Sequence, residues 1–196
     1  MARPRNFQET EVLNAVTELF WKKGFADTSI TDLEQVTGLT RTSIYAAYEN
    51  KKSLYHRSLC LYQSQAFTHV QRIFDEIENP IEAIRVLLTE TLQRAFNDDD
   101  KKGCFIANAA AEMYQNCELT TSFLTDNKNK FVQLIKDKLS TDVSKLKIEL
   151  RPKVDVLAAF IFTSYSGSMI MLKNGGKKEE IFPAIDLLID FIKESN

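Results

Sequence analysis

The chain has 196 residues and a formal net charge of −2, and 44% of its residues are hydrophobic and 27% charged. This composition excludes a disordered or fibrous chain and is typical of one or two globular domains that need neither disulfides nor a structural metal. Only six Gly and four Pro residues are available for turns, which disfavours a strand-rich fold and predicts an all-α class.

Three features bear on the compartment of the protein. The amino terminus carries basic residues with no apolar segment behind them, which predicts no secretory signal and a cytoplasmic protein. Cys60, Cys104 and Cys117 cannot all pair with one another, as expected in a reducing compartment. The uncharged stretch 156–172 approaches the length of a membrane span, but a polar run over 163–168 interrupts it. We therefore expect no membrane partner and a helix buried between protein neighbours.

Apolar residues recur with helical spacing along almost the whole chain and predict about nine helices and no strand. The first expected helix ends at Gly24 and carries an apolar stripe formed by Val12, Leu13, Val16, Leu19 and Phe20. The others are expected at about 30–37, 41–48, 51–79, 80–97, 104–115, 119–139, 152–174 and 179–194, with a loop over 140–151.

Capping signals mark the starts of several of these helices. Ser29 followed by Asp32 resembles a capping box, in which the hydroxyl and the carboxylate satisfy free N–H groups of the first turn. Thr40 and Asn50 are suited to cap the next two helices, and Pro80 suits the first position of another. These signals predict where the helices begin.

Residues 29–45 place a short helix, a turn at Gly38 and a second short helix in sequence. The apolar residues of this segment are spaced to form a common core: Leu33, Val36, Leu39 and Ile44. The order is that of a helix-turn-helix, whose second helix enters the major groove of DNA. The alternative is an ordinary helical hairpin in a bundle, with surface charges that contact nothing.

The second helix of this motif is expected to expose four side chains, namely Arg41, Thr42, Ser43 and Tyr45. Arginine reads guanine in the major groove, and hydroxyls bind phosphates or bases. Basic residues outside the motif are suited to phosphate or minor-groove contacts, and these are Arg3, Arg5, Lys51 and Lys52.

The motif and its flanks resemble the DNA-binding domain of the TetR family of transcriptional regulators. The resemblance extends from the first helix to Tyr55. It rests on Phe20-Trp21-Lys22-Lys23-Gly24-Phe25, Thr28-Ser29-Ile30, Gly38-Leu39, Ile44-Tyr45 and Asn50-Lys51. The all-helical remainder agrees with that family in length and order.

This resemblance implies a helix-turn-helix DNA-binding domain over residues 1–50 and an effector-binding and dimerisation domain over residues 51–196. It implies a homodimer that binds a palindromic operator, usually represses transcription, and releases DNA when a small molecule binds the carboxy-terminal domain. By residue matching, the DNA contacts are expected from Ser29, Thr31, Arg41, Thr42, Ser43, Tyr45, Tyr48 and Lys51.

A second resemblance concerns Lys102-Gly103-Cys104-Phe105 and the residues up to Glu112. This segment is similar to the Gly-Cys segment of electrophile- and oxidant-responsive repressors within the same family. Cys104 is expected at a helix amino terminus just after Lys101 and Lys102, and both features favour a reactive thiolate. The alternative is a small residue needed for tight packing where the helix begins.

Aromatic and Met residues on the central helices are candidates to line an effector pocket, although each of them also suits an ordinary core position. The candidates are Phe67, Phe105, Met113, Phe162 and Tyr165.

The last two expected helices, 152–174 and 179–194, carry more apolar surface than one neighbour covers. The final helix has one face formed by Ile181, Ile185, Leu188 and Ile192 and another formed by Ala184, Leu187 and Phe191. An isologous dimer, in which both helices meet their copies in a four-helix bundle, covers both faces. The alternative is burial inside the monomer.

Two alternatives from other functional classes are a helical partner-binding module without DNA binding and a cysteine-dependent enzyme. His56 and His69 are the only histidines, and nothing in the sequence places either beside Cys104, so no catalytic pair is indicated. Metal-ligand spacings and phosphate-binding glycine loops do not occur. We therefore expect no metal, no cofactor and no enzymatic activity.

Overall fold

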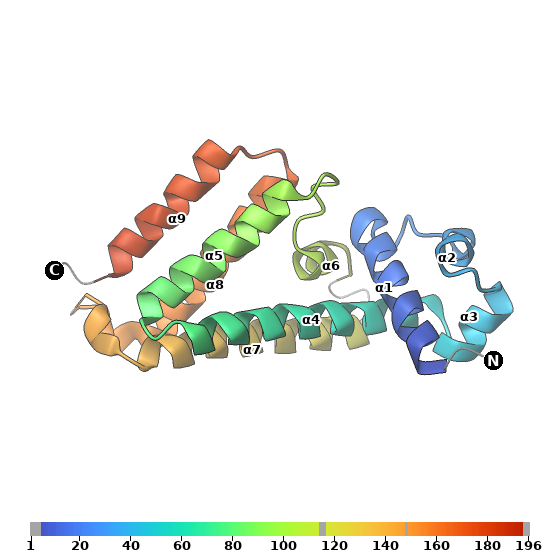
Figure 1. Ribbon diagram of the computed structural model, residues 1–196, viewed down its shortest axis with the longest axis horizontal. Coiled ribbons are helices and arrows are strands. Elements are labelled where there is room, and N and C mark those ends of the chain that lie inside the picture. Colours follow the sequence, from blue (N-terminus) through green and yellow to red (C-terminus); the bar gives the residue numbers. More distant parts are fainter. Residues whose placement is uncertain (1–4, 114–116, 148, 194–196) are drawn as a thin grey trace. The chain divides into compact units, whose positions relative to one another are not determined.

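The computed structural model describes residues 5–113, 117–147 and 149–193, and this described part contains nine α-helices (Figure 1). Their bounds are α1 Arg5–Lys23, α2 Ile30–Thr37, α3 Arg41–Tyr48, α4 Lys51–Glu76, α5 Pro80–Asn97, α6 Phe105–Met113, α7 Glu118–Ser140, α8 Val154–Lys173 and α9 Lys178–Ile192. Two short 3-10 helices, η1 Val143–Lys145 and η2 Arg151–Lys153, precede α8. The predicted all-α class with about nine helices is confirmed.

The chain divides into two compact units. The first unit comprises the residues up to Ala66 together with Asn108–Leu124, and the second comprises Phe67–Ala107 together with the residues from Thr125 onward. The described residues 5–50 lie within the first unit. Because the boundary passes through α4, α6 and α7, each of these three helices contributes residues to both units.

The core of the first unit is built by α1, α2, α3 and the beginning of α4. Phe20, Leu33 and Tyr55 are almost completely buried, and the Phe20 ring meets the Tyr55 ring edge-on with centroids 5.0 Å apart. The prediction that Val36 joins this core is wrong, because its side chain is 42% exposed. The eight-residue helix α2 buries one narrow stripe, and Leu33 occupies it.

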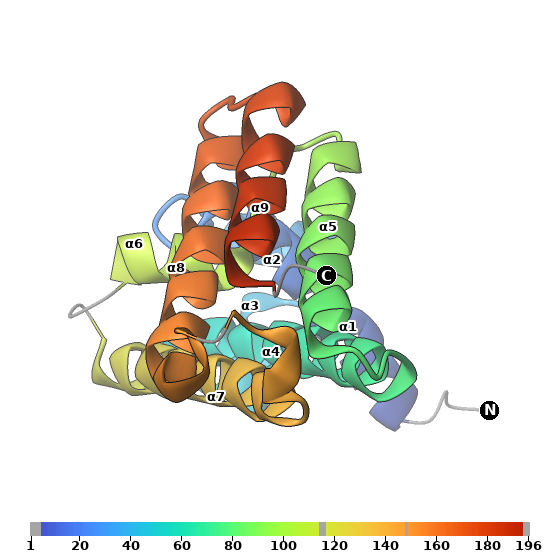
Figure 2. The same cartoon turned by 90° about the vertical axis from the view of Figure 1, so that its left-hand side faces the viewer.

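Helices α5, α8 and α9 pack against one another in the second unit, as Figure 2 shows. Helix α5 buries Ile84, Leu88 and Leu92, and α9 buries Ile185 and Ile189. Pro80 occupies the first turn of α5, and the Asn79 side chain caps that helix by accepting hydrogen bonds from two backbone N–H groups. Asn79 and Pro80 thus set the start of α5, and burial of its apolar residues packs it against α8 and α9.

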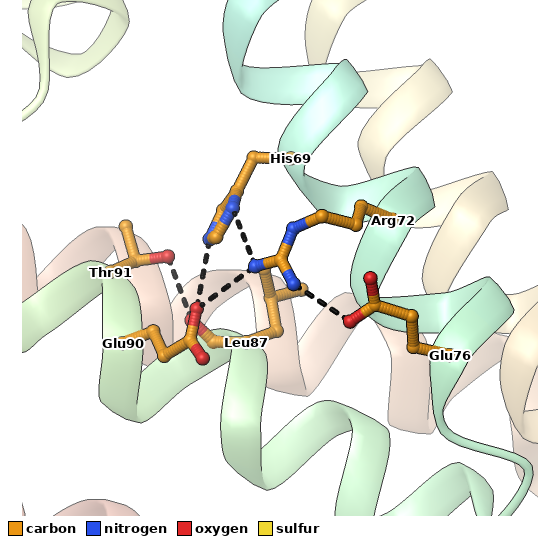
Figure 3. Close-up of polar contacts among 6 residues, drawn as sticks. All are labelled: His69, Arg72, Glu76, Leu87, Glu90 and Thr91. Carbon is orange, nitrogen blue, oxygen red and sulfur yellow. Dashed lines mark hydrogen bonds and ion pairs between the residues drawn. The ribbon is translucent and has the colours of Figure 1, made fainter.

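A group of charged side chains joins α4 to α5 in the second unit (Figure 3). The Arg72 guanidinium lies 2.7 Å from the Glu76 carboxylate on its own helix and 3.4 Å from the Glu90 carboxylate on α5. His69 Nε2 lies 3.5 Å from the same Glu90 carboxylate. Exposed ion pairs of this kind contribute little to stability, so the apolar contacts of α5 dominate.

The segment predicted as a loop over 140–151 contains more structure than its sequence indicates. Asp142 caps η1 by accepting a hydrogen bond of 3.1 Å from the Ser144 N–H group. Leu146 is fully buried and forms an isolated antiparallel bridge with Lys193 at the end of α9. The bridge between Leu146 and Lys193 joins residues far apart in the chain, and helical periodicity does not reveal it.

Helix α8 is apolar on two faces. Together with η2 it spans Arg151–Lys173, a segment long and apolar enough to cross a membrane by length and composition. One face is buried in the second unit and includes Leu157, Ala158, Ile161, Met169 and Leu172. The other exposes Val156, Phe160, Ile170 and Met171.

Candidate nucleic-acid interface

Helix α2 begins with the predicted capping box. The Ser29 hydroxyl accepts a hydrogen bond of 3.1 Å from the Asp32 N–H group, and the Asp32 carboxylate accepts one of 2.8 Å from the Ser29 N–H group. Gly38 ends the helix in the left-handed region at φ 66°, with its N–H group donating to the Glu34 carbonyl. A glycine adopts this conformation without steric cost, so the sequence sets both ends of α2.

Helix α3 is held by its own cap and by a hydrogen bond to α2. Thr40 caps α3 by accepting a hydrogen bond of 3.3 Å from the Ser43 N–H group, which confirms its predicted role. The Arg41 N–H group donates to the Glu34 carboxylate of α2 at 2.7 Å. Ile44 is buried beneath the helix. The orientation of α3 is therefore set by one apolar anchor and one hydrogen bond between the helices.

The outer face of α3 presents the predicted groove-facing residues. Arg41, Thr42 and Ser43 are exposed, and Tyr45 is half-buried. The Arg41 guanidinium lies 5.5 Å from the centroid of the Tyr45 ring, close enough for a cation–π interaction. This arrangement presents a guanidinium, two hydroxyls and a phenol side by side, a combination suited to base edges and phosphates.

Ser29 and Thr31 are both exposed at the amino terminus of α2. Their hydroxyls and the free N–H groups of this first turn are of the kind that binds a phosphate oxygen. The carboxylate of Asp32 competes there as a negative charge. Ser29 is already hydrogen-bonded to that carboxylate, since its hydroxyl donates to Asp32 Oδ2 at 2.8 Å.

Two of the predicted phosphate ligands, Tyr48 and Lys51, are less exposed to solvent than the residues above. Tyr48 is only 3% exposed, and the Arg57 guanidinium lies 5.3 Å from its ring centroid. Lys51 is half-buried, with Nζ 4.4 Å from the centroid of the Phe25 ring. Burial raises the pKa of Tyr48 and lowers that of Lys51. Their phosphate contacts stay predictions.

Sequence reasoning missed two carboxylates of the first unit. Glu34 accepts the hydrogen bond from Arg41 described above, and Glu112 of α6 accepts hydrogen bonds from the N–H groups of Phe25 and Ala26. Glu34 lies inside the segment 29–45 and Glu112 ends the Gly-Cys segment, but no role was predicted for either side chain. No signal in a single sequence indicates a partner so far along the chain as Glu112.

Three of the five predicted effector-pocket residues surround Phe131 of α7 in the second unit. The Phe131 ring stacks on Tyr165 with centroids 5.5 Å apart, and its distances to the rings of Phe162 and Phe67 are 5.5 Å and 6.3 Å. Phe105 is fully buried in the second unit. The fifth residue, Met113, is buried within the first unit and is therefore not part of this group.

A surface hollow of about 360 Å³ lies between α4 and α7. Its lining consists of Phe67, Gln71, Lys130, Gln133 and Leu134. Among the predicted pocket residues, Phe67 lines it.

Cys104 is buried at the position preceding α6, and its thiol forms a hydrogen bond with Tyr165. Burial and this neighbour raise the pKa of Tyr165 well above its usual range. The flanking lysines have other partners, since Lys102 pairs with Asp98 at 3.2 Å and Lys101 donates to a carbonyl of α5. A reactive thiolate at Cys104 stays a prediction.

The described residues contain no group of three His, Cys, Asp or Glu side chains that could hold a metal ion. His56 instead meets the Phe123 ring edge-on at 5.3 Å and lies 3.6 Å from the Cys60 sulfur. His69 belongs to the charged group between α4 and α5. Cys60, Cys104 and Cys117 are all free thiols.

The Asp32 carboxylate of the capping box makes the stability of the fold depend on pH. A hydrogen bond from Lys23, followed by bonds from Ser29, lowers the pKa of Asp32 from 3.8 to about 2. The stabilisation of the fold by the ionised Asp32 carboxylate is therefore complete above pH 3.8 and is lost as the pH falls through about 2. A carbon NMR titration of the Asp32 carboxyl should show its midpoint rising toward 3.8 in Lys23→Met. Lys52→Met should leave the midpoint unchanged, and an unchanged midpoint in Lys23→Met would contradict the assignment.

Comparison with known proteins finds a family model and several relatives that are similar to this chain. A family model described as bacterial regulatory proteins of the tetR family matches residues 12–57. The HTH-type transcriptional repressor ComR of Escherichia coli (strain K12) is 24% identical over 181 residues, which cover 91% of this chain and 86% of ComR. The HTH-type transcriptional repressor BdcR of the same organism is 24% identical over 161 residues, covering 76% and 82% of the two chains.

Solved structures show the same fold. A cysteine mutant of the TetR family transcriptional regulator CifR, complexed with 26-bp operator DNA, superposes with a TM-score of 0.84 at 21% identity, covering 96% of this chain and 98% of that one. A TetR transcriptional regulator from Chloroflexus aurantiacus superposes with a TM-score of 0.85 at 17% identity, covering 97% and 98%. The relatives are regulators rather than enzymes, which confirms that prediction. Residues 12–57 of the chain thus match the tetR family of bacterial regulatory proteins, and most of the chain is similar to HTH-type transcriptional repressors and has the fold of TetR-family regulators.

Proposed function

We propose that the protein is a cytoplasmic, homodimeric repressor that binds a palindromic operator and releases it when a small molecule binds its second unit. The observation that carries this proposal is the exposed ridge of Arg41, Thr42 and Ser43 on a capped and anchored α3. ComR and BdcR, which match most of this chain, are both described as repressors. Neither a partner-binding module without DNA binding nor an enzyme accounts for that ridge.

In this proposal α3 enters the major groove and α2 lies against the backbone. Arg41 would read a guanine, while Thr42, Ser43 and Tyr45 would contact bases or phosphates. Thr31 and Ser29 would bind phosphate at the amino terminus of α2. Tyr48, because it is buried, would contribute mainly by anchoring α3, and Lys51 would reach a phosphate only by leaving the Phe25 ring.

The dimer would form through α8 and α9. Both helices bury one apolar face in the second unit and expose another, and the exposed residues are Val156, Phe160, Ile170, Met171, Leu187 and Phe191. Phe160 and Phe191 meet edge-on with ring centroids 6.3 Å apart, so the two helices form one continuous surface. An apolar patch of this kind on a regulator marks a protein interface. A second copy of the same two helices covers it with twofold symmetry.

Release would follow from a two-state change in the dimer. Operator binding requires the two α3 helices to lie about 34–36 Å apart, one turn of DNA. An effector bound in the second unit, where Phe67, Phe162 and Tyr165 surround Phe131, would favour a state with another spacing. Shifting the populations from 1:99 to 99:1 requires about 5.5 kcal/mol of differential binding. The aromatic lining suits an apolar effector.

Replacing Arg41 tests the DNA contact. Arg41→Ala should weaken binding to the operator by about 1–3 kcal/mol, the value of one good arginine–guanine contact. Fluorescence anisotropy with a duplex from the gene's own upstream region measures this change at fixed salt. Lys128→Ala removes an exposed positive charge from α7 and should leave the affinity unchanged. Equal affinity of Arg41→Ala and wild type would remove Arg41 from the reading residues.

Charge introduced on the exposed face of α9 tests the dimer. Leu187 is 71% exposed, and Leu187→Glu should convert the dimer into a monomer because it places unpaired carboxylates in the interface. Light scattering after size-exclusion chromatography would show the mass halved. Leu119→Glu changes an equally apolar residue of α7, 49% exposed, and should remain dimeric. A wild-type chain that elutes as a monomer would contradict the proposed dimer through α8 and α9.

The possible role of Cys104 as a redox or electrophile sensor has a direct test. A thiol-reactive compound such as N-ethylmaleimide should release wild type from the operator and leave Cys104→Ser bound, because only the thiol is alkylated. Cys60→Ser serves as the control, since it lacks the exposed Cys60 thiol but keeps Cys104 and should be released like wild type. Equal release of wild type and Cys104→Ser would leave Cys104 with a packing role only.

A further inference from the structure

The turn between α1 and α2 is held by a side chain from α6. The Glu112 carboxylate accepts a hydrogen bond of 2.8 Å from the Phe25 N–H group through Oε2 and one of 2.6 Å from the Ala26 N–H group through Oε1. Hydrogen bonds to an ionised carboxylate are about twice as strong as neutral ones. One carboxylate thus satisfies two consecutive backbone donors of the turn that leads into the DNA-reading helices.

The backbone at Gly24 is shaped for this carboxylate. Gly24 has φ +83°, and its own N–H group closes α1 by donating to the Phe20 carbonyl at 2.8 Å. The left-handed residue aims the next two N–H groups in one direction, an arrangement that binds anions. A Cβ atom at Gly24 would lie 3.0 Å from Glu112 Oε2, so the glycine also makes room for the carboxylate.

The Glu112 carboxylate also interacts electrostatically with Lys51 of α4. Lys51, at the first position of α4, places Nζ 4.4 Å from the centroid of the Phe25 ring. Burial lowers the pKa of Lys51, and the Glu112 carboxylate acts in the opposite direction, as expected for an opposite charge nearby. Phe25, Lys51 and Glu112 therefore form one group at the junction of α1, α4 and α6.

The position of Glu112 along α6 gives this contact its significance. Helix α6 begins at Phe105, directly after Cys104, and its residues up to Ala107 belong to the second unit. Glu112 lies on the same helix and belongs to the first unit. Because a helix moves as a stiff rod over so few residues, any rotation or shift of α6 that begins in the second unit displaces the Glu112 carboxylate.

We propose that Glu112 is a positioning residue for DNA binding, whose carboxylate clamps the Phe25–Ala26 turn and thereby fixes α2 and α3 on α1. Withdrawal of this carboxylate by a movement of α6 lets α2 and α3 shift relative to α1 as intact helices. This inference rests on the proposed function and adds a specific link to it, from α6 to the turn before the helix-turn-helix.

The test combines amide hydrogen exchange, read by NMR on the DNA-free protein, with operator affinity. In Glu112→Ala the Phe25 and Ala26 amides should exchange about tenfold faster, as expected when a hydrogen bond to a charged group is lost. The α2 amides should keep their protection, which shows that the unit remains folded. Affinity for a duplex from the gene's own upstream region should fall about fivefold or more, the lower end for coupled sites.

Two further variants sharpen the test. Glu112→Gln keeps one acceptor oxygen and the shape of the side chain, so it should give exchange rates and an affinity between those of wild type and Glu112→Ala. Glu118→Gln removes an exposed carboxylate at the start of α7 and should change neither measurement.

The possible outcomes separate the clamp from the proposed function. Unchanged exchange at Phe25 and Ala26 in Glu112→Ala would overturn the clamp. Faster exchange with unchanged operator affinity would overturn its role in positioning. A wild-type protein that binds no duplex would contradict the proposed function, and the exchange rates would still decide whether the clamp exists.

Discussion

The structure depends first on how a helix too short to be stable alone is held in place. Helix α3 has eight residues, fewer than an isolated helix needs in water. Its stability comes from burial of Ile44 and Tyr48, from the Thr40 cap and from the hydrogen bond of Arg41 to Glu34. Because these contacts use one side and one end of α3, the opposite side stays exposed and its side chains are fixed in direction.

The second constraint is that the two compact units share helices. The division of the chain passes through α4, α6 and α7, so three continuous helices contribute residues to both units. Helix α4 has 26 residues, whereas α6 is a short rod that carries Glu112 near its end. In α8 and α9 an apolar face stays exposed in the described part of the chain.

Much of the candidate site was predictable, since helix starts and ends depend on neighbouring residues. Arg41–Tyr48 matches the predicted helix in both bounds, and Ser29, Thr40 and Gly38 perform the predicted capping roles. Helical spacing also predicted burial of Ile44. It failed for Val36, because periodicity gives the face of a helix but not how far its neighbours extend over that face.

The amino-acid sequence by itself determined the helical class, the order of the helices and the resemblance of residues 12–57 to the tetR family, because spacing, caps and turn residues act over a few positions. Only the tertiary structure decided that Lys51 rests on the Phe25 ring, that Cys104 is buried against Tyr165 and that Glu112 holds the turn before α2. Each of these contacts joins residues distant in sequence. Their partners are chosen by how the helices pack, which local patterns do not encode.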